Sequence, residues 1–157
     1  MRKNNIEIST PPCYTTSLVI QIADINYGGH VGNERYLLFA QETRLRFLAE
    51  IGCSEMKFGE YGLVLAEASV EYLHELFYGD HITISLSIGD IGRASFECMY
   101  VVEVKRSDKK MMAAKLSTKM VCFDYTERKI KSIPDHLKKT LQQCANGELK
   151  LSVPNLP

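Results

Sequence analysis

The sequence predicts an α+β fold in which an antiparallel sheet of about five strands wraps around one long central helix. Between residues 63 and 122, apolar and polar residues alternate with a period of two, which is typical of strands with one buried face. The links between these runs are short and rich in turn residues, so neighbouring strands are expected to be antiparallel. Residues 34–51 instead form a helix whose surface is mostly apolar, and such a helix must be covered on most sides.

The first strand is expected over residues 15–23, which are rich in β-branched residues and contain no Gly or Pro. A glycine-rich loop follows, and the helix over 34–51 begins after it. Gly32 or Asn33 is expected to cap the start of this helix, with Glu34 in its first turn. Gly52 is expected to end it.

The remaining strands are expected over residues 63–73, 81–88, 93–104 and 112–122. Their links carry Gly79-Asp80, Gly89-Asp90 and Ser107-Asp108. After Pro134, a last helix is expected over residues 135–143. We therefore divide the chain into a loose lead-in (1–14), one domain (15–145) and a polar tail (146–157).

The composition excludes several classes of function. The 157 residues carry 19 basic and 19 acidic side chains, and this balance gives no electrostatic reason to expect nucleic acid or a membrane surface as partner. The N-terminus lacks the apolar core of a signal peptide, and no apolar run is long enough to span a bilayer. Five widely spaced cysteines without a CxxC pair favour neither a disulfide framework nor a zinc site. A cytoplasmic setting is therefore expected.

The loop before the helix has the composition of a binding site. Asp24, Asn26 and His30 lie among three glycines, which allow a ligand to approach the backbone closely. The helix start then offers unpaired N–H groups to an anion or a developing oxyanion.

The stretch ADINYGGHVGNERYLLFAQETRLRFL at residues 23–48 resembles the loop-and-helix segment of the 4-hydroxybenzoyl-CoA thioesterase superfamily, whose members have the hotdog fold. Weaker agreement follows in the same order along the chain, so that the resemblance covers about residues 15–136. The segments that carry this weaker agreement are Val70-Glu71-Tyr72, Tyr78-Gly79-Asp80, Val121-Cys122-Phe123-Asp124, Lys129 and Ile133-Pro134.

The resemblance implies an acyl-CoA or acyl-ACP thioesterase in which a carboxylate attacks the thioester or activates water. The loop acid of many members falls on Asn26, and an amide cannot act as a base. Plant acyl-ACP thioesterases carry a helix Glu six residues after the helix Tyr, which matches Glu42 after Tyr36. The resemblance therefore leaves Asp24 and Glu42 as base or nucleophile, with Asn26 and His30 placing the water and the carbonyl.

Gly29, Asn33 and Tyr36 are expected to contact the substrate, with the Asn33 N–H as an oxyanion donor. The resemblance implies that neither a metal nor an organic cofactor is needed. It also implies a homodimer or homotetramer whose sheets join edge to edge, with sites between subunits.

Other interpretations stay open. Glu42 lies four residues before Arg46, so a surface ion pair would explain it without any catalytic role. Arg44 lies in an apolar stripe and needs a partner, either in a structural salt bridge or in a ligand. The spacing Asp24-x-Asn26 followed by His30 is close to that of hotdog hydratases, but the proline of their motif is missing. A binding module without turnover is the third alternative.

Overall fold

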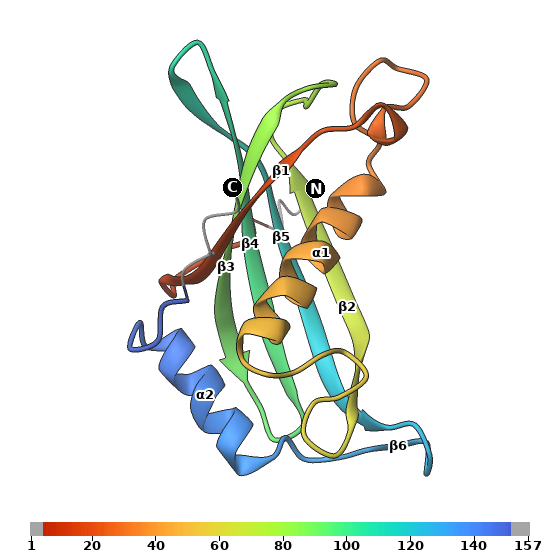
Figure 1. Ribbon diagram of the computed structural model, residues 1–157, viewed down its shortest axis with the longest axis vertical. Helices are drawn as coiled ribbons and strands as arrows, with labels where there is room; N and C mark the ends of the chain where they lie inside the picture. Colours follow the sequence, from red (N-terminus) through yellow and green to blue (C-terminus); the bar gives the residue numbers. More distant parts are fainter. Residues whose placement is uncertain (1–4, 152–157) are drawn as a thin grey trace.

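The computed structural model describes residues 5–151 (Figure 1). Five strands and two helices account for most of these residues, together with one short helical turn and one very short strand. In chain order they are β1 (Pro12–Val19), η1 (Ile22–Asp24), α1 (Arg35–Glu50), β2 (Gly62–Tyr72), β3 (His81–Ile91), β4 (Ser95–Arg106), β5 (Lys109–Asp124), β6 (Lys129–Ile130) and α2 (Asp135–Ala145).

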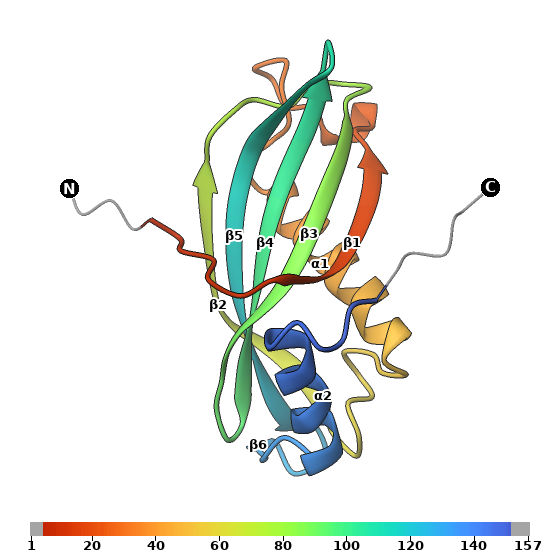
Figure 2. The same cartoon turned by 90° about the vertical axis from the view of Figure 1, so that its left-hand side faces the viewer.

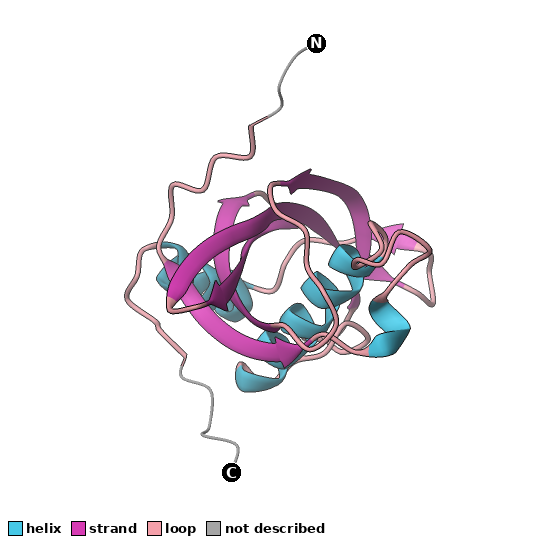
Figure 3. Cartoon of the chain, turned by 90° about the horizontal axis from the view of Figure 1, so that it is seen from above, coloured by secondary structure: helices cyan, strands magenta, loops and turns pink. Residues whose placement is uncertain are grey.

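The strands form one antiparallel sheet in the order β1-β3-β4-β5-β2, and β6 pairs with the end of β5 (Figure 2). The sheet curves around α1, as the view from above shows (Figure 3). This arrangement confirms the predicted antiparallel sheet around a helix. It leaves β1 and β2 as the two edges, so β2 has no strand partner on its outer side among the described residues.

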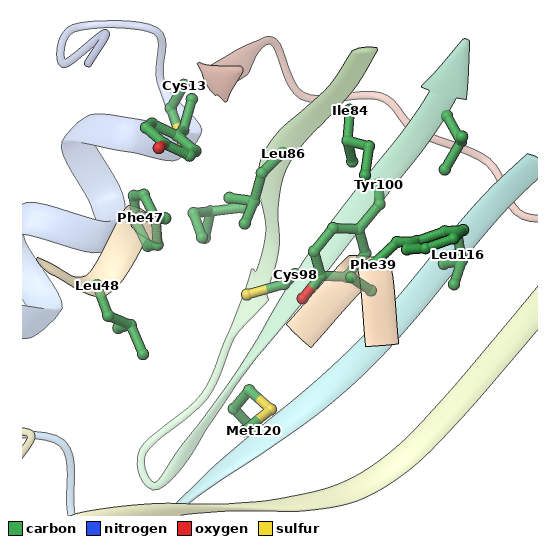
Figure 4. Close-up of a cluster of buried hydrophobic side chains, with 14 of the residues drawn as sticks. Cys13, Phe39, Phe47, Leu48, Ile84, Leu86, Cys98, Tyr100, Leu116 and Met120 are labelled. Carbon is green, nitrogen blue, oxygen red and sulfur yellow. The ribbon is translucent and has the colours of Figure 1, made fainter. Parts of the chain in front are cut away.

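The core fills the space between α1 and the concave face of the sheet (Figure 4). The alternation predicted for the strands agrees with the buried positions, since β3, β4 and β5 each bury every second side chain. The largest fully buried side chains are Tyr100, Phe47, Phe58, Phe96, Ile20, Leu48, Leu76, Ile82, Ile84, Leu86, Ile88 and Leu116.

The end of α1 agrees with the sequence, and its start differs. Gly52 adopts a φ of +75° directly after the helix, and the Cys53 N–H donates to the Leu48 carbonyl at 2.7 Å. This is the closing turn for which glycine is favoured. At the start, however, Glu34 is the N-cap residue and its side chain makes no capping hydrogen bond. The expected cap by Gly32 or Asn33 is therefore wrong, since the N-cap position falls one residue later, at Glu34.

One face of α1 remains open, in contrast to the expectation that the helix is covered on most sides. The side chains of Leu37, Leu38 and Leu45 are 39%, 46% and 39% exposed. The sheet is not closed, so it covers the helix only from the side of the core. Val64 and Leu65 on the neighbouring edge strand β2 are 38% and 45% exposed. The helix and the sheet edge therefore share an uncovered apolar surface.

Both ends of the described chain pack on the domain. β1 begins at Pro12, so part of the expected lead-in belongs to the sheet, where Cys13 and Tyr14 are buried. The Leu151 N–H donates to the Cys13 carbonyl at 2.7 Å, which ties the start of the predicted tail to β1. The remainder of these two predicted segments, residues 1–4 and 152–157, lies outside the described residues. Neither helix in the described part is long and apolar enough to cross a membrane.

Candidate active site

The loop before α1 is a tight turn held by its own backbone. The Asn26 N–H donates to the His30 carbonyl at 2.9 Å, and the Gly29 N–H donates back to the Asn26 carbonyl at 3.1 Å. The Asn26 side-chain oxygen accepts the Gly28 N–H at 2.9 Å. Gly29 has a φ of +80°, a conformation that side chains rarely tolerate. Asn26 and Gly29 thus build the turn that carries His30.

The Asp24 carboxylate makes contacts that stabilise the local backbone and the start of α1. Its Oδ2 accepts the Gln21 N–H at 2.8 Å, and its Oδ1 lies 3.9 Å from the Arg35 Nε. Arg35 in turn donates to the Ala23 carbonyl at 2.7 Å. These contacts hold η1 against the start of α1.

His30 presents a free ring nitrogen. Its Nδ1 lies 3.1 Å from the Val31 carbonyl oxygen, which can only accept, so Nδ1 carries the proton in the neutral ring and Nε2 keeps its lone pair. Nε2 lies 3.9 Å from Oε1 of Glu75. A side chain at position 28 would place its Cβ 2.9 Å from Nε2 and 3.2 Å from the Asn26 Oδ1. Gly28 therefore leaves room for the imidazole next to the amide oxygen.

The start of α1 offers two consecutive N–H groups. Within residues 5–151, neither the Asn33 N–H nor the Glu34 N–H donates a hydrogen bond to another residue. The Tyr72 hydroxyl donates to the Asn33 carbonyl at 2.8 Å and so fixes this turn against the end of β2. The Tyr36 ring packs edge-on against Tyr72, and burial raises the pKa of Tyr36 to about 12.

Two hollows flank the start of α1. The first hollow, about 550 Å³, lies between α1 and strands β2 and β5; the second hollow, about 490 Å³, lies between the glycine loop and the end of β2. The first is lined by Glu34, Leu37, Leu38, Gln41, Arg44, Glu55, Leu63, Val64, Leu65, Thr118, Met120 and Tyr125. The second is lined by Asn26, Tyr27, His30, Val31, Asn33, Tyr36, Tyr72, Leu73, His74 and Glu75. Asn33 lines the second hollow, and Glu34, the next residue in the chain, lines the first.

A polar group of side chains, which we call the floor, comprises Arg44, Glu55 and Thr118, which line the first hollow, and Tyr100, which is fully buried behind them. The Arg44 Nε and Nη2 each lie 2.8 Å from Oε1 of Glu55. The Arg44 Nη1 donates to the Tyr100 hydroxyl at 3.0 Å and to Thr118 Oγ1 at 3.3 Å. Burial alone would lower the pKa of Arg44, but the adjacent Tyr100 and Glu55 raise it. Arg44 is therefore a cation in a salt bridge within its own chain.

Glu42 lies away from both hollows. Its Oε1 is 2.8 Å from the Arg46 Nε, and Arg46 also donates to Thr16 of β1 at 2.7 Å. This is the ion pair that the spacing of four residues indicates. The structure thus brings Asn26, His30, Asn33 and Tyr36 together in the second hollow, while Asp24 and Glu42 do not line either hollow.

Sequence reasoning missed three carboxylates that do line the hollows, Glu34 and Glu55 in the first and Glu75 in the second. Glu55 and Glu75 lie in loops outside the recognised motif, and nothing in their local sequence shows which wall they reach. Among the described residues, no group of three or more His, Cys, Asp or Glu side chains could hold a metal ion.

Comparison with known proteins gives a consistent result. The family model of the thioesterase-like superfamily matches residues 20–141. A 1,4-dihydroxy-2-naphthoyl-CoA hydrolase of Nostoc punctiforme is 35% identical over 78 residues, which is 50% of each protein. The enzyme of that name from Microcystis aeruginosa is 27% identical over 126 residues, or 78% of this chain and 88% of that protein.

Among solved structures, a 1,4-dihydroxy-2-naphthoyl-CoA thioesterase from Synechocystis has a similar fold. Its TM-score is 0.71 at 23% sequence identity, and the match covers 82% of this chain and 94% of that one. This likeness confirms the predicted hotdog fold.

Proposed function

The chain belongs to the thioesterase-like superfamily, and we propose that it hydrolyses the thioester of an aromatic acyl-CoA to a carboxylic acid and free coenzyme A. The two sequence relatives described above are hydrolases of one aromatic acyl-CoA. The observation that carries the proposal is the pair of N–H groups at Asn33 and Glu34, which donate no hydrogen bond among the described residues and lie at the junction of an apolar and a polar hollow.

We assign the thioester carbonyl to this junction. Its oxygen gains negative charge when the tetrahedral intermediate forms, and the two N–H groups, with the dipole of α1, would stabilise that charge. The acyl group then extends into the first hollow, whose volume of about 550 Å³ lies in the usual range for small-molecule sites. The thiol side leaves through the second hollow.

The general base of the proposal is His30. Asn26 has no basic lone pair, and Asp24 and Glu42 are held in contacts outside the hollows. The His30 Nε2 carries a lone pair and faces the second hollow, beside the Asn26 side-chain oxygen that would orient a water. Glu75, 3.9 Å away, would stabilise the imidazolium that forms.

The proposed reaction has two steps. A water oxygen bonds to the carbonyl carbon while its proton passes to the His30 Nε2, and the carbonyl oxygen becomes an oxyanion at the Asn33 and Glu34 N–H groups. The carbon–sulfur bond then breaks as the C=O bond re-forms, and the departing thiolate takes the proton from the imidazolium. The products are the carboxylic acid and the free thiol, and His30 is neutral again.

A second copy of this chain is the proposed cover of the open surface. Within the described part of the chain, no strand pairs with the outer edge of β2, and an uncovered edge is an aggregation hazard unless it is paired or protected. Leu37, Leu38, Val64 and Leu65 line the first hollow beside this edge and are at least 38% exposed. Pairing of two β2 strands would close both hollows in a homodimer. All five cysteines are free, which fits the proposed cytoplasmic setting.

Release of free thiol from a panel of acyl-CoA thioesters tests the proposal. The panel contains aromatic acyl groups, straight-chain acyl groups of increasing length, and one acyl carrier protein thioester for comparison. The wild-type protein is expected to prefer aromatic acyl-CoA. Activity that persists in His30→Gln but disappears in Asp24→Asn or Glu42→Gln would contradict the proposed base. No release from any substrate would contradict the function itself.

A further inference from the structure

The two N–H groups at the start of α1 belong to two successive peptide units. The Asn33 N–H shares its peptide unit with the Gly32 carbonyl, and the Glu34 N–H shares its peptide unit with the Asn33 carbonyl. A peptide unit is planar and trans, so its C=O and its N–H point in opposite directions. A partner that holds the carbonyl of either peptide therefore also orients the N–H.

The two carbonyls are held by different partners. The Gly32 carbonyl accepts the Arg35 N–H at 3.0 Å, so the first peptide is fixed by the backbone of the turn itself. The Asn33 carbonyl accepts the Tyr72 hydroxyl at 2.8 Å, and in the described part of the chain no backbone N–H donates to it. The orientation of the Glu34 N–H thus depends on one side chain from the end of β2.

The Asn33–Glu34 peptide is the middle peptide of the turn that the hydrogen bond between Arg35 and Gly32 closes. That closing bond leaves the middle peptide without a partner inside the turn, and turns of types I and II differ in the direction that this peptide faces. Glu34 has a φ of −69° and a ψ of −24°, which matches a type I turn. A hydrogen bond at the Asn33 carbonyl stabilises this one of the two directions.

Tyr72 is itself held in place for this contact. It is the last residue of β2, where it pairs with Ala114 of β5, and its ring lies 5.1 Å from the ring of the buried Tyr36, centroid to centroid. Partial burial and the nearby Glu34 carboxylate raise the pKa of Tyr72. The hydroxyl therefore keeps its proton at neutral pH and can donate to a carbonyl.

We propose that Tyr72 is a positioning residue for thioester hydrolysis, which orients and strengthens the Glu34 N–H as an oxyanion donor through the Asn33 carbonyl. The inference rests on the proposed function, which places the oxyanion at this N–H. A hydrogen bond at the carbonyl polarises the peptide and makes its N–H a stronger donor. Because the negative charge on the substrate oxygen develops only in the transition state, the hydroxyl acts on kcat more than on binding.

The stability of the fold gives little reason for this hydroxyl. The Tyr72 side chain is 51% exposed, and a hydrogen bond at such a position replaces one with water, so that its net contribution to folding is small. A water molecule would satisfy the Asn33 carbonyl as well. A side chain anchored in β2 differs from water because it holds the peptide in one fixed direction.

The test compares the wild type with Tyr72→Phe, which removes the hydroxyl and keeps the ring. With 2-naphthoyl-CoA as substrate, kcat is expected to fall about 10-fold, less than the roughly 10²- to 10³-fold loss typical of removing an oxyanion donor outright. KM should change by less than about twofold. Inhibition by the 2-naphthylmethyl thioether of coenzyme A should stay unchanged, because this compound has a CH2 group in place of the carbonyl and presents no oxygen to the N–H.

Thr43→Val is the matched control. The Thr43 hydroxyl also donates to a backbone carbonyl at 2.8 Å, that of Phe39 on α1, but Thr43 is buried and lines neither hollow. This variant is expected to keep the wild-type kcat, and urea unfolding checks that both variants are folded. An equal fall of kcat in the two variants would overturn the inference, since a general loosening of the fold would explain it.

The Glu34 amide nitrogen gives a readout that needs no catalysis. Loss of the hydrogen bond at the Asn33 carbonyl should change the 15N chemical shift of this nitrogen in Tyr72→Phe and leave it unchanged in Thr43→Val. An unchanged shift in Tyr72→Phe would overturn the inference.

The remaining outcomes separate this inference from the proposed function. If Tyr72→Phe keeps the wild-type kcat, or loses thioether inhibition together with kcat, Tyr72 does not act on the oxyanion and the thioesterase function stands. If the wild type releases no thiol while the 15N shift still responds to Tyr72→Phe, the proposed function fails. The hydroxyl then only supports the turn, and the inference is overturned as well.

Discussion

The two hollows beside the start of α1 are built from different chemistry. The second hollow gathers titratable and amide side chains, His30, His74, Glu75 and Asn26, on a glycine loop and the end of β2. The first is walled mainly by apolar side chains, and its polar parts are Glu34, Gln41 and the floor. In the proposed function, this contrast separates bond-breaking chemistry from substrate selection on the two sides of one helix start. Substitutions on the two sides should therefore change different quantities.

Replacing the base should have the largest effect. His30→Gln keeps a polar side chain but removes the basic nitrogen, so kcat is expected to fall about 10²- to 10⁴-fold, the range for loss of a general base. Because His30 does not contact the acyl group in the proposed site, KM should change little. Steady-state thiol release with one aromatic acyl-CoA measures both constants. His136→Gln on the exposed side of α2 is the matched control, and a similar loss in it would break the comparison.

The fold could be predicted from the sequence more completely than the different chemistry of the two hollows. The strands were predicted from alternation that the burial of β3, β4 and β5 confirms, because a period of two follows from strand geometry alone. The start of β1 was missed because Pro11-Pro12 suggested a loose segment, whereas Pro12 begins an edge strand, where proline is tolerated. The open face of α1 was missed because an apolar helix pattern does not distinguish cover by its own sheet from cover by another chain.

The second largest effect concerns stability and belongs to the first hollow. Arg44→Leu leaves Glu55 without its cation and Tyr100 and Thr118 without their donor, so the free energy of unfolding should fall by about 3 kcal/mol. Glu42→Leu, two residues earlier on α1, removes an ion pair that is about a third to a half exposed and should cost less than about 1 kcal/mol. Urea unfolding of the two variants makes this comparison. Equal losses in the free energy of unfolding would mean that the buried ion pair of the floor stabilises the fold no more than the exposed ion pair does.

The candidate site was predicted in part. Asn26, His30, Asn33 and Tyr36 do come together, because the motif that contains them is a continuous turn and helix start. Asp24 and Glu42 were expected from the resemblance, and their local contacts with Gln21 and Arg46 are already inherent in their spacings of three and four residues. Glu75 reaches His30 across forty-five residues of chain, and no local pattern encodes such a contact. Contacts between a motif and residues far away in the sequence therefore could not be predicted from the sequence alone.

A smaller effect is expected from Glu75, since it acts through His30. Glu75→Gln removes a negative charge 3.9 Å from the His30 Nε2. A pair of exposed charges at this distance contributes about 1 kcal/mol, which corresponds to about a fivefold effect on the stabilisation of the imidazolium in the proposed mechanism. The value of kcat should therefore fall by about the same factor. Steady-state thiol release with one aromatic acyl-CoA measures the change. An unchanged kcat would show that Glu75 does not act through His30.

The smallest effect concerns the support of the loop that carries Glu75. Arg106 donates to the Glu75 carbonyl at 2.8 Å and to Oδ2 of Asp80 at 2.6 Å, and the Phe77 N–H also donates to Asp80. Burial alone would raise the pKa of Asp80, but the bonds from Arg106 and Phe77 hold it below its ordinary value. Ionised Asp80 therefore stabilises the fold at neutral pH, and this contribution disappears as the pH falls through the lowered folded-state value.

Asp80→Asn is thus expected to lower the free energy of unfolding by about 1 kcal/mol at pH 7, as for a partly exposed charged pair, and by less as the pH falls below about 4. Urea unfolding of the wild type and the variant at several pH values measures the difference. A difference that stays constant down to acid pH would show that the side chain acts by its shape and not by its charge. Because Arg106 also holds the Glu75 carbonyl, any loss of activity in this variant should be no larger than that of Glu75→Gln and should leave the preference among acyl groups intact. A change in that preference would mean that the two sides of the helix start are not independent.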